Sequence, residues 1–263
     1  HHVGQARHPS LPVLGVHVWL VVRPVRIDGS GLALAEGKEY LLEGRLAPVA
    51  RSLGFGSIAE LVQHLRRSPS SDAALSLVVD AMTTNETLFF RDHHPFEALR
   101  TLIVPDLAAR RPADQPIRIW STAASAGQEP YSIAMILREN PGLAAGRPVE
   151  ILASDISTEM LRRAEDGLYT DFEVRRGLDP GRLARFFERE GQSWRLAPEI
   201  RRMVRFQRIN LLDPFDHVGA VDVVFCRNVL IYFDVPTKAD VVERIADRLR
   251  DDGYLVLGGA ETL

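Results

Sequence analysis

Four short stretches of the 263-residue chain carry polar side chains at positions where an α/β protein usually binds its ligand. Each follows a predicted buried strand, and the stretches are Ser121–Glu129, Asp155, Asn210 with Leu211, and Arg227 with Asn228. Because the carboxyl ends of parallel strands meet at one edge of a sheet, they are expected to form one site. Taken singly, Glu129 could be a helix N-terminal charge and Asp155 an Asx turn. Four polar strand ends in one sheet favour a binding site.

The turn Ser121–Gln128 indicates which kind of ligand this site would bind. It reads STAASAGQ, and such small residues let a ligand approach the backbone, while Gly127 can adopt backbone angles closed to other residues. The turn is neither GxGxxG nor a GK[ST] phosphate loop, which argues against a pyrophosphate. Asp155, at the end of the next strand, is where the two hydroxyls of a ribose would be held. We therefore expect an adenosine ligand without a pyrophosphate.

The elements that must position these residues alternate between strand and helix. Apolar runs predict strands at 117–120, 149–153, 204–210, 221–226 and 254–258. One helix is expected to begin at Glu129-Pro130, since proline suits the first turn of a helix, and another to span Pro236 to Arg250. Gly191–Leu196 could pair as a small antiparallel element. The pattern is typical of a doubly wound parallel sheet.

The part of the chain before this sheet has a helical pattern. Apolar positions predict helices over 41–53 and 72–81. Between them, a capping box from Ser57 to Glu60 predicts the start of another helix. A fourth helix is expected to begin near Pro95 and to be interrupted by Pro105. No strand is expected here. The predicted domains are thus a helical one over 31–111 and a sheet domain over 112–263. Residues 1–30, which begin His1-His2, are interpreted as a tag remnant or leader.

Composition excludes several classes of function. The net charge of −3 gives no general attraction for nucleic acid. The apolar patch Val13–Val22 is far shorter than the roughly 20 residues of a membrane span. A single cysteine, Cys226, allows no internal disulfide and suits a reducing cytoplasm. Since no CxxC or HExxH spacing occurs, a cytoplasmic protein without a metal site is expected.

A second unusual segment, TTNETLFFRD, lies between two predicted helices at 83–92. Phe89 and Phe90 are expected in the core, which leaves Asn85, Thr87 and Arg91 to be explained. Together with AASAGQEPYSIAM, ASDIS, INLLD and FCRNVLIYFD, in this order, the segment resembles the CheR family. These chemotaxis methyltransferases methylate glutamate side chains of chemoreceptors with S-adenosyl-L-methionine. The resemblance runs from about Leu32 to the last residue.

The resemblance implies a fold and a set of site residues. The fold would be a class I methyltransferase sheet (Rossmann-like α/β) behind a small N-terminal all-helical domain, with an antiparallel β-subdomain inserted at about 190–208. Arg91 and Tyr232 lie where the family places residues that orient the substrate, and no metal is implied. The implied cofactor-binding residues are Asn85, Thr87, Arg91, Glu129, Asp155, Asn210, Leu211, Arg227 and Asn228.

The implied partners are the cytoplasmic helices of methyl-accepting chemotaxis receptors. The short stretch EGQSWRLAPE predicts that the protein works without a tether to the receptor's C-terminal pentapeptide. The chain departs from the family at Gln128, where a glutamate is common, and at Leu263, since relatives usually continue to a closing hairpin. Two alternatives remain: methylation of a small carboxylic acid, and a non-catalytic CheR-like module that senses the cofactor and binds a signalling partner.

Overall fold

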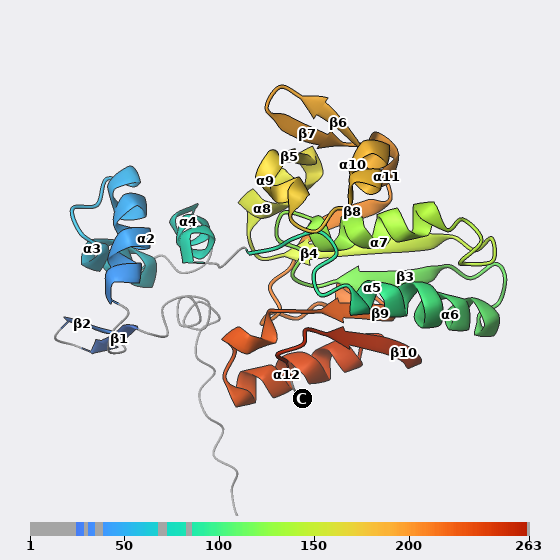
Figure 1. Cartoon of the computed structure of the whole chain (residues 1–263). Helices are drawn as coiled ribbons and strands as arrows, with labels where there is room; N and C mark the ends of the chain where they lie inside the picture. The colour runs from blue at the N-terminus through green and yellow to red at the C-terminus, as the bar shows by residue number, and fades with distance from the viewer. Residues whose placement is uncertain (1–24, 29–30, 35–38, 68–72, 83–85, 262–263) are drawn as a thin grey trace, which may run out of the picture. The chain divides into compact units, whose positions relative to one another are not determined.

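The computed structural model describes residues 25–28, 31–34, 39–67, 73–82 and 86–261, and the chain divides after Thr84 into two units (Figure 1). The first unit contains an antiparallel hairpin, β1 (Val25–Asp28) with β2 (Gly31–Leu34). Only helices are expected from residue 31 onward, so the hairpin corrects that prediction. The overlooked signal is Asp28-Gly29, a turn dipeptide between two short strands. The prediction for residues 1–24 lies outside the described residues.

Three helices of the first unit pack around their own core, as predicted. They are α2 (Glu39–Ser52), α3 (Ile58–Arg67) and α4 (Ala73–Met82). Leu46, Leu61 and Val78 are buried where the helices meet. The capping box at the start of α3 is present in part, since Glu60 N donates to Ser57 Oγ over 3.2 Å. The Glu60 carboxylate accepts from Gly56 N and not from Ser57 N.

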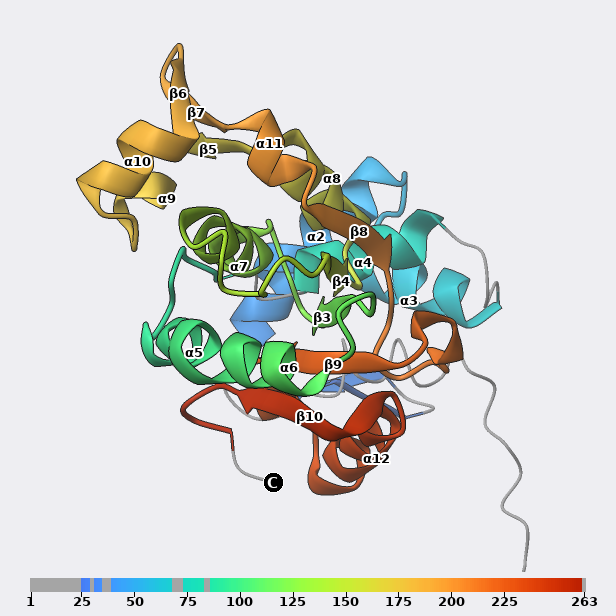
Figure 2. The ribbon, with the colours of Figure 1, turned by 90° about the vertical axis from the view of Figure 1, so that its right-hand side faces the viewer.

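The second unit is built on a five-stranded parallel sheet in the order β10-β9-β3-β4-β8 (Figure 2). Its strands are β3 (Ile117–Ser121), β4 (Val149–Asp155), β8 (Val204–Arg208), β9 (Val221–Cys226) and β10 (Leu249–Leu257). All five overlap the predicted strands. β10 begins at Leu249 and not at 254, however, so the helix predicted over Pro236 to Arg250 is too long, and it ends at Ala246. The chain runs outward from β3 through β4 to β8, then crosses to β9 and β10, so the strand order reverses between β3 and β9. Ligands of such sheets bind at this reversal, beside the carboxyl ends of the strands.

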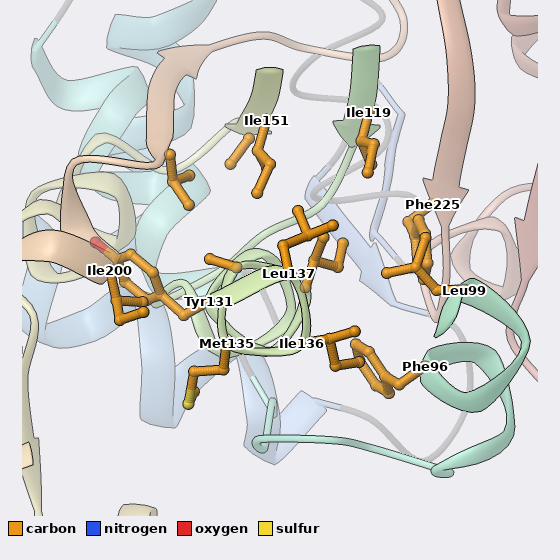
Figure 3. Close-up of a cluster of buried hydrophobic side chains, with 14 of the residues drawn as sticks. Phe96, Leu99, Ile119, Tyr131, Met135, Ile136, Leu137, Ile151, Ile200 and Phe225 are labelled. Carbon is orange, nitrogen blue, oxygen red and sulfur yellow. The ribbon is translucent and has the colours of Figure 1, made fainter. Parts of the chain in front are cut away.

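Side chains of the central strands alternate between two cores, one on each face of the sheet. On one face Ile119, Val223 and Phe225 pack against α7 (Gln128–Glu139), as Figure 3 shows for Ile119, Phe225 and Ile136. On the other face Trp120, Val224 and Cys226 pack with residues of α12 (Val235–Ala246). Both faces of the sheet are therefore covered, as expected for a doubly wound fold.

The division between the units corrects the predicted boundary at 111/112. Residues 94–110 form α5 (His94–Ala98), a π-helical turn (Leu99–Ile103) and α6 (Val104–Arg110), and all lie in the second unit. The buried side chains of Phe96 and Leu99 share a core with Ile136 and Phe225 (Figure 3). The amphipathic pattern that predicts these helices does not reveal whether they pack on other helices or on a sheet.

Pro105 does not interrupt the helical path, which corrects a second prediction. The preceding turn widens to π geometry, and Val104 N donates to the carbonyl of Leu99, five residues earlier. Pro105 then occupies the first turn of α6, where a missing N–H leaves no bond unmade.

The antiparallel insertion has three strands in the order β5-β7-β6, with bounds Leu168–Thr170, Ser193–Leu196 and Phe187–Glu190. The prediction of 190–208 is therefore wrong in extent: the insertion starts earlier, and Val204–Arg208 belongs to the central sheet. Strands of three and four residues are too short to show an alternating pattern. The remaining elements are α8 (Thr158–Asp166), α9 (Asp171–Arg175), α10 (Pro180–Phe186), α11 (Pro198–Arg201), and short 3₁₀ turns at Asp216–Val218 and Leu230–Tyr232. None of the described helices could span a membrane.

Candidate functional site

The turn between β3 and α7 has a tightly fixed backbone. Ser125 and Gly127 have φ of 48° and 91°, in the left-handed region. A Cβ on Gly127 would lie 2.9 Å from both Tyr131 Cε2 and Ala164 Cβ, so no larger residue fits there without displacing its neighbours. Ser125 N donates to Asp155 Oδ2 over 2.8 Å, which joins the ends of two adjacent strands. The small residues of this turn therefore give it a shape, as well as room for a ligand.

Asp155 ends β4 at the carboxyl edge of the sheet and is 6% exposed. Besides the bond from Ser125 N, its Oδ1 accepts from Ser157 N over 2.9 Å. These two backbone bonds fix the orientation of the carboxylate. A carboxylate has about four lone-pair positions and accepts hydrogen bonds from hydroxyl groups as well as from N–H groups.

Arg227 joins three segments of the chain at this edge. Its Nη1 donates to Glu129 Oε2 over 2.8 Å, and its Nη2 donates to Asp92 Oδ2 over 2.7 Å and to the Arg91 carbonyl over 2.9 Å. The side chain of Arg227 is 1% exposed, against 13% for Glu129 and 50% for Asp92. Arg227 thus connects the loop after β9 to the start of α7 and to the TTNETLFFRD segment.

Glu129 is a carboxylate held largely away from water. Burial raises its pKa, and this effect is opposed by the nearby Arg227 charge and by the hydroxyl of Ser121. Ser121 Oγ donates to Glu129 Oε1 over 2.8 Å. Because a desolvated anion is stabilised by a nearby cation, the arrangement favours a positively charged ligand beside Glu129.

The segment that contacts Arg227 has a strained backbone. Phe90, Asp92 and His93 have φ of 52°, 68° and 46°, values that are unfavourable for residues other than glycine. Phe90 N donates to Ser132 Oγ on α7 over 2.9 Å, and Arg227 binds the carbonyl of Arg91. Such strain persists only where surrounding contacts impose it, and it concentrates at functional sites.

The antiparallel insertion supports the same segment from its other side. The ring of Phe89 is fully buried and lies edge-on to Tyr169 and Phe187, with centroid distances of 5.1 Å and 5.5 Å. Gly177 passes so close that a Cβ there would lie 1.8 Å from the Phe89 carbonyl oxygen. Tyr169 also donates to the Ala126 carbonyl over 2.7 Å. The insertion therefore supports both the segment at 86–93 and the turn after β3.

The remaining predicted residues are placed as follows. Arg91 Nη1 donates to the Glu86 carbonyl over 3.0 Å, within its own segment, and it is Asp92 whose side chain contacts Arg227. Asn210 Oδ1 accepts from Leu212 N over 3.1 Å, and Leu211 is buried in the core that contains Trp120. Thr87 is partly buried, Asn228 partly exposed, and Tyr232 is 54% exposed. Asn85 lies outside the described residues.

One residue of this edge was not predicted. Glu261 is 8% exposed, and its carboxylate accepts backbone N–H bonds from Asn228, Val229, Leu230 and Gly258. It follows Gly258-Gly259, just past the strand that neighbours β9. An acid beyond a strand end was the signal that singled out Asp155, and the same rule would have found Glu261.

Unpaired polar atoms and carboxylates at this edge bear on its fit to an S-adenosyl nucleoside. Among the described residues, Gln128 Oε1 and Arg227 Nε are buried without a hydrogen-bond partner. Buried polar atoms are normally paired, and these two lack partners at the edge where a ligand would bind. The carboxylates of Glu129 and Asp155 suit a cationic sulfur and a ribose respectively. Within the described part of the chain, no cluster of three or more His, Cys, Asp or Glu residues could hold a metal ion.

Comparison with known proteins identifies the family. The family described as "CheR methyltransferase, SAM binding domain" matches residues 85–263, and "CheR methyltransferase, all-alpha domain" matches residues 28–83. The chain belongs to the CheR methyltransferase family. The match confirms the α/β class I methyltransferase fold, and it assigns the carboxyl-edge residues to an S-adenosylmethionine-binding domain.

Several relatives are similar over most of the chain. The "Chemotaxis protein methyltransferase Cher2" of Pseudomonas putida is 43% identical over 89% of this chain and 86% of its own length. "Chemotaxis protein methyltransferase 1" of Pseudomonas aeruginosa is 44% identical over 89% of this chain and 85% of its own. The "Chemotaxis protein methyltransferase" of Salmonella typhimurium is 38% identical over 88% of this chain and 79% of its own.

Proposed function

We propose that this protein transfers a methyl group from S-adenosyl-L-methionine to glutamate side chains of methyl-accepting chemotaxis receptors, forming methyl esters. The observation that carries the proposal is the convergence on Arg227 of Glu129, from α7, and of the strained segment Glu86–His93. Membership of a methyltransferase family, and relatives named for chemotaxis, support the reaction class and the acceptor.

The carboxyl-edge residues would hold the cofactor. When bound, S-adenosylmethionine supplies an electrophilic methyl group on a positively charged sulfur. Asp155 would accept hydrogen bonds from the ribose hydroxyls, and Glu129 would place its negative charge near the methionine end. Asn210 and Leu211 would flank the adenine. The remaining proposed contacts are Asn85, Thr87, Arg91, Arg227 and Asn228.

The acceptor glutamate requires orientation and no general base. Its pKa is near 4.3, so the carboxylate is already the nucleophile at neutral pH. Transfer requires the attacking oxygen, the methyl carbon and the sulfur to lie in line, and holding reactants in such a geometry accelerates a reaction strongly. The Arg91 guanidinium would hold the carboxylate in a fork and Tyr232 would donate one hydrogen bond. The exposure of Tyr232, 54%, leaves its hydroxyl accessible to a macromolecular acceptor.

The decisive experiment incubates the protein with methyl-labelled cofactor and receptor-bearing membranes. Base-labile label on the receptor is expected. Label confined to small molecules would favour a small-carboxylate methyltransferase, and tight cofactor binding without transfer would favour a non-catalytic module. Tyr232→Phe should lower kcat while S-adenosylhomocysteine still binds, because Tyr232 is assigned to the acceptor alone. Arg91, which is assigned to both acceptor and cofactor, should on change to alanine lower kcat more than it weakens S-adenosylhomocysteine binding.

We also infer that the receptor's C-terminal pentapeptide is not a tether for this protein. Strands β6 and β7 are joined by Gly191 and Gln192 alone, with Gly191 at a φ of 62°. This short connection offers little surface for a peptide strand. Calorimetry with a receptor C-terminal pentapeptide should detect no binding, and measurable affinity would contradict the inference.

A further inference from the structure

A buried carboxylate closes the loop that follows β9. Glu261 Oε1 accepts from Val229 N and Leu230 N, both over 2.8 Å. Its Oε2 accepts from Asn228 N over 2.9 Å and from Gly258 N over 2.7 Å. Four backbone donors on one carboxylate is a complete set, two for each oxygen. Such bonds to a charged acceptor are among the strong hydrogen bonds of proteins.

The backbone around Glu261 forms a concave site that closely fits its carboxylate. Successive backbone N–H groups next to a left-handed residue form a concave anion-binding nest, and Asn228 has a φ of 59°. A Cβ on Gly258 would lie 2.8 Å from Glu261 Oε2 and 3.0 Å from Asn228 Nδ2. The nest in the loop after β9 is thus filled by the chain's own anion, which comes from beyond the neighbouring strand β10.

The loop held by Glu261 carries two residues that the proposed function uses. Arg227 precedes the nest and is buried against Glu129, whereas Tyr232 follows it and is exposed. Leu230 is buried, but Ile231 is 49% exposed, so apolar packing fixes only part of this loop. The bonds from Asn228, Val229 and Leu230 to Glu261 therefore determine how Arg227 and Tyr232 are placed relative to each other.

We propose that Glu261 is a positioning residue for methyl transfer, which acts by fixing the loop from Arg227 to Tyr232 and does not itself touch the substrate. The proposal rests on the proposed function, since it assigns to Tyr232 a role toward the acceptor. Misplacing a substrate-orienting group by about 1 Å is sufficient to lower a rate by about 100-fold. The main effect of losing the Glu261 charge should thus appear in kcat, with a smaller effect on cofactor binding.

The test compares Glu261→Gln with Asp222→Asn. Glutamine keeps the size of the side chain but removes its charge, and its amide nitrogen would face two N–H donors. Asp222 is the matched control, because it too is a buried carboxylate that accepts a backbone N–H, from Arg118 over 2.9 Å, but it lies at the opposite end of β9. Glu261→Asp keeps the charge on a shorter side chain and serves as the rescue variant.

Three quantities are measured for each protein: kcat with receptor membranes, the Kd of S-adenosylhomocysteine, and hydrogen exchange of peptides covering 226–233. For Glu261→Gln we expect kcat to fall by about 10- to 100-fold, Kd to change by less than about threefold, and exchange of 226–233 to accelerate by at least about tenfold. Glu261→Asp should recover part of the loss. In Asp222→Asn, kcat and Kd should stay near the wild-type values, and any faster exchange should be spread over the second unit and not centred on 226–233.

Unchanged hydrogen exchange at 226–233 in a folded Glu261→Gln protein would overturn the proposal. Losses of kcat and cofactor affinity that are equal in Glu261→Gln and Asp222→Asn would also overturn it. If the wild-type protein binds S-adenosylhomocysteine but methylates no receptor, the proposed function fails. The exchange comparison then decides on its own whether Glu261 holds the loop.

Discussion

The two ends of β9 each bury a cluster of ion pairs, an acid between two arginines at the amino end and an arginine between two acids at the carboxyl end, yet they differ in backbone strain. At the amino end, Asp222 is fully buried and contacts Arg111 Nε over 2.8 Å and Arg250 Nε over 3.2 Å. At the carboxyl end, Arg227 binds Glu129 and Asp92. Among the described residues, six other than glycine have positive φ, and five of them lie in the segments around the carboxyl end: Phe90, Asp92, His93, Ser125 and Asn228.

This difference separates a stabilising cluster from a binding cluster. The amino-end cluster joins α6 to β9 and β10 through favourable backbone conformations, so its pairing contributes directly to folding. The carboxyl-end cluster keeps residues with strained backbone angles in place. Part of the folding free energy is thus used to maintain a preformed ligand site.

The largest expected effect is that of Arg227→Met. Removing the arginine leaves Glu129 buried without its cation and releases the strained segment at 90–93. Breaking a buried ion pair in this way costs about 3–5 kcal/mol of unfolding free energy. Urea denaturation should show that loss, and calorimetry should show that S-adenosylhomocysteine binding is abolished. If the Arg227→Met protein still binds the cofactor, the carboxyl-end cluster does not differ from the amino-end cluster in contributing to ligand binding.

Asp222→Asn should destabilise the protein by about 3 kcal/mol, because Arg111 and Arg250 lose a buried partner. For a unit of this size the melting temperature should fall by roughly 5–10 °C. Below that temperature, the kcat and the Kd of S-adenosylhomocysteine should match the wild type. A changed Kd would show that the amino-end cluster also contributes to binding.

Asp155→Ala should weaken S-adenosylhomocysteine binding by about 100-fold, measured by calorimetry. The variant loses the proposed bonds to the ribose and releases Ser125, and hydrogen bonds to charged groups contribute about 1.5–3 kcal/mol each. Asp222→Asn is again the control, as its binding should be unchanged. Unaltered binding in Asp155→Ala would show that the ribose is held elsewhere.

The smallest effect is the pH dependence that Glu129 introduces. Since burial raises its pKa above the ordinary 4.5, the folded protein binds this proton more tightly than the unfolded chain does. Glu129 therefore lowers stability as the pH rises from that ordinary value through the raised pKa. Over the same window, affinity for the sulfonium cofactor should increase relative to affinity for S-adenosylhomocysteine, whose sulfur carries no charge. Titration calorimetry should show this change in the wild type and its absence in Glu129→Gln.

The sequence predicted the central sheet well because each of its strands is an apolar run followed by turn residues, which is a local pattern. The same pattern identified Asp155 and Glu129 at strand ends. It could not show that Arg227 binds Asp92, since these residues are 135 positions apart. The widened turn before Pro105 and the packing of residues 94–110 on the sheet likewise depend on tertiary contacts.

Two contacts of the site could not be predicted from the sequence, because they too depend on tertiary structure. The TTNETLFFRD segment gives no sign that Asp92 makes a side-chain contact to Arg227. The strand-end pattern marks Glu261 as a candidate, but it does not reveal its partners, because these are the backbone N–H groups of Asn228, Val229 and Leu230.

The contact between Phe89 and the antiparallel insertion has an evolutionary consequence. Because the Phe89 ring packs against Tyr169 and Phe187, and its carbonyl leaves no space for a side chain at Gly177, neither stretch can change shape alone. A lineage that lost or rebuilt the insertion would need compensating substitutions around Phe89 in the same step. The two stretches should therefore be inherited together, as a single unit of descent.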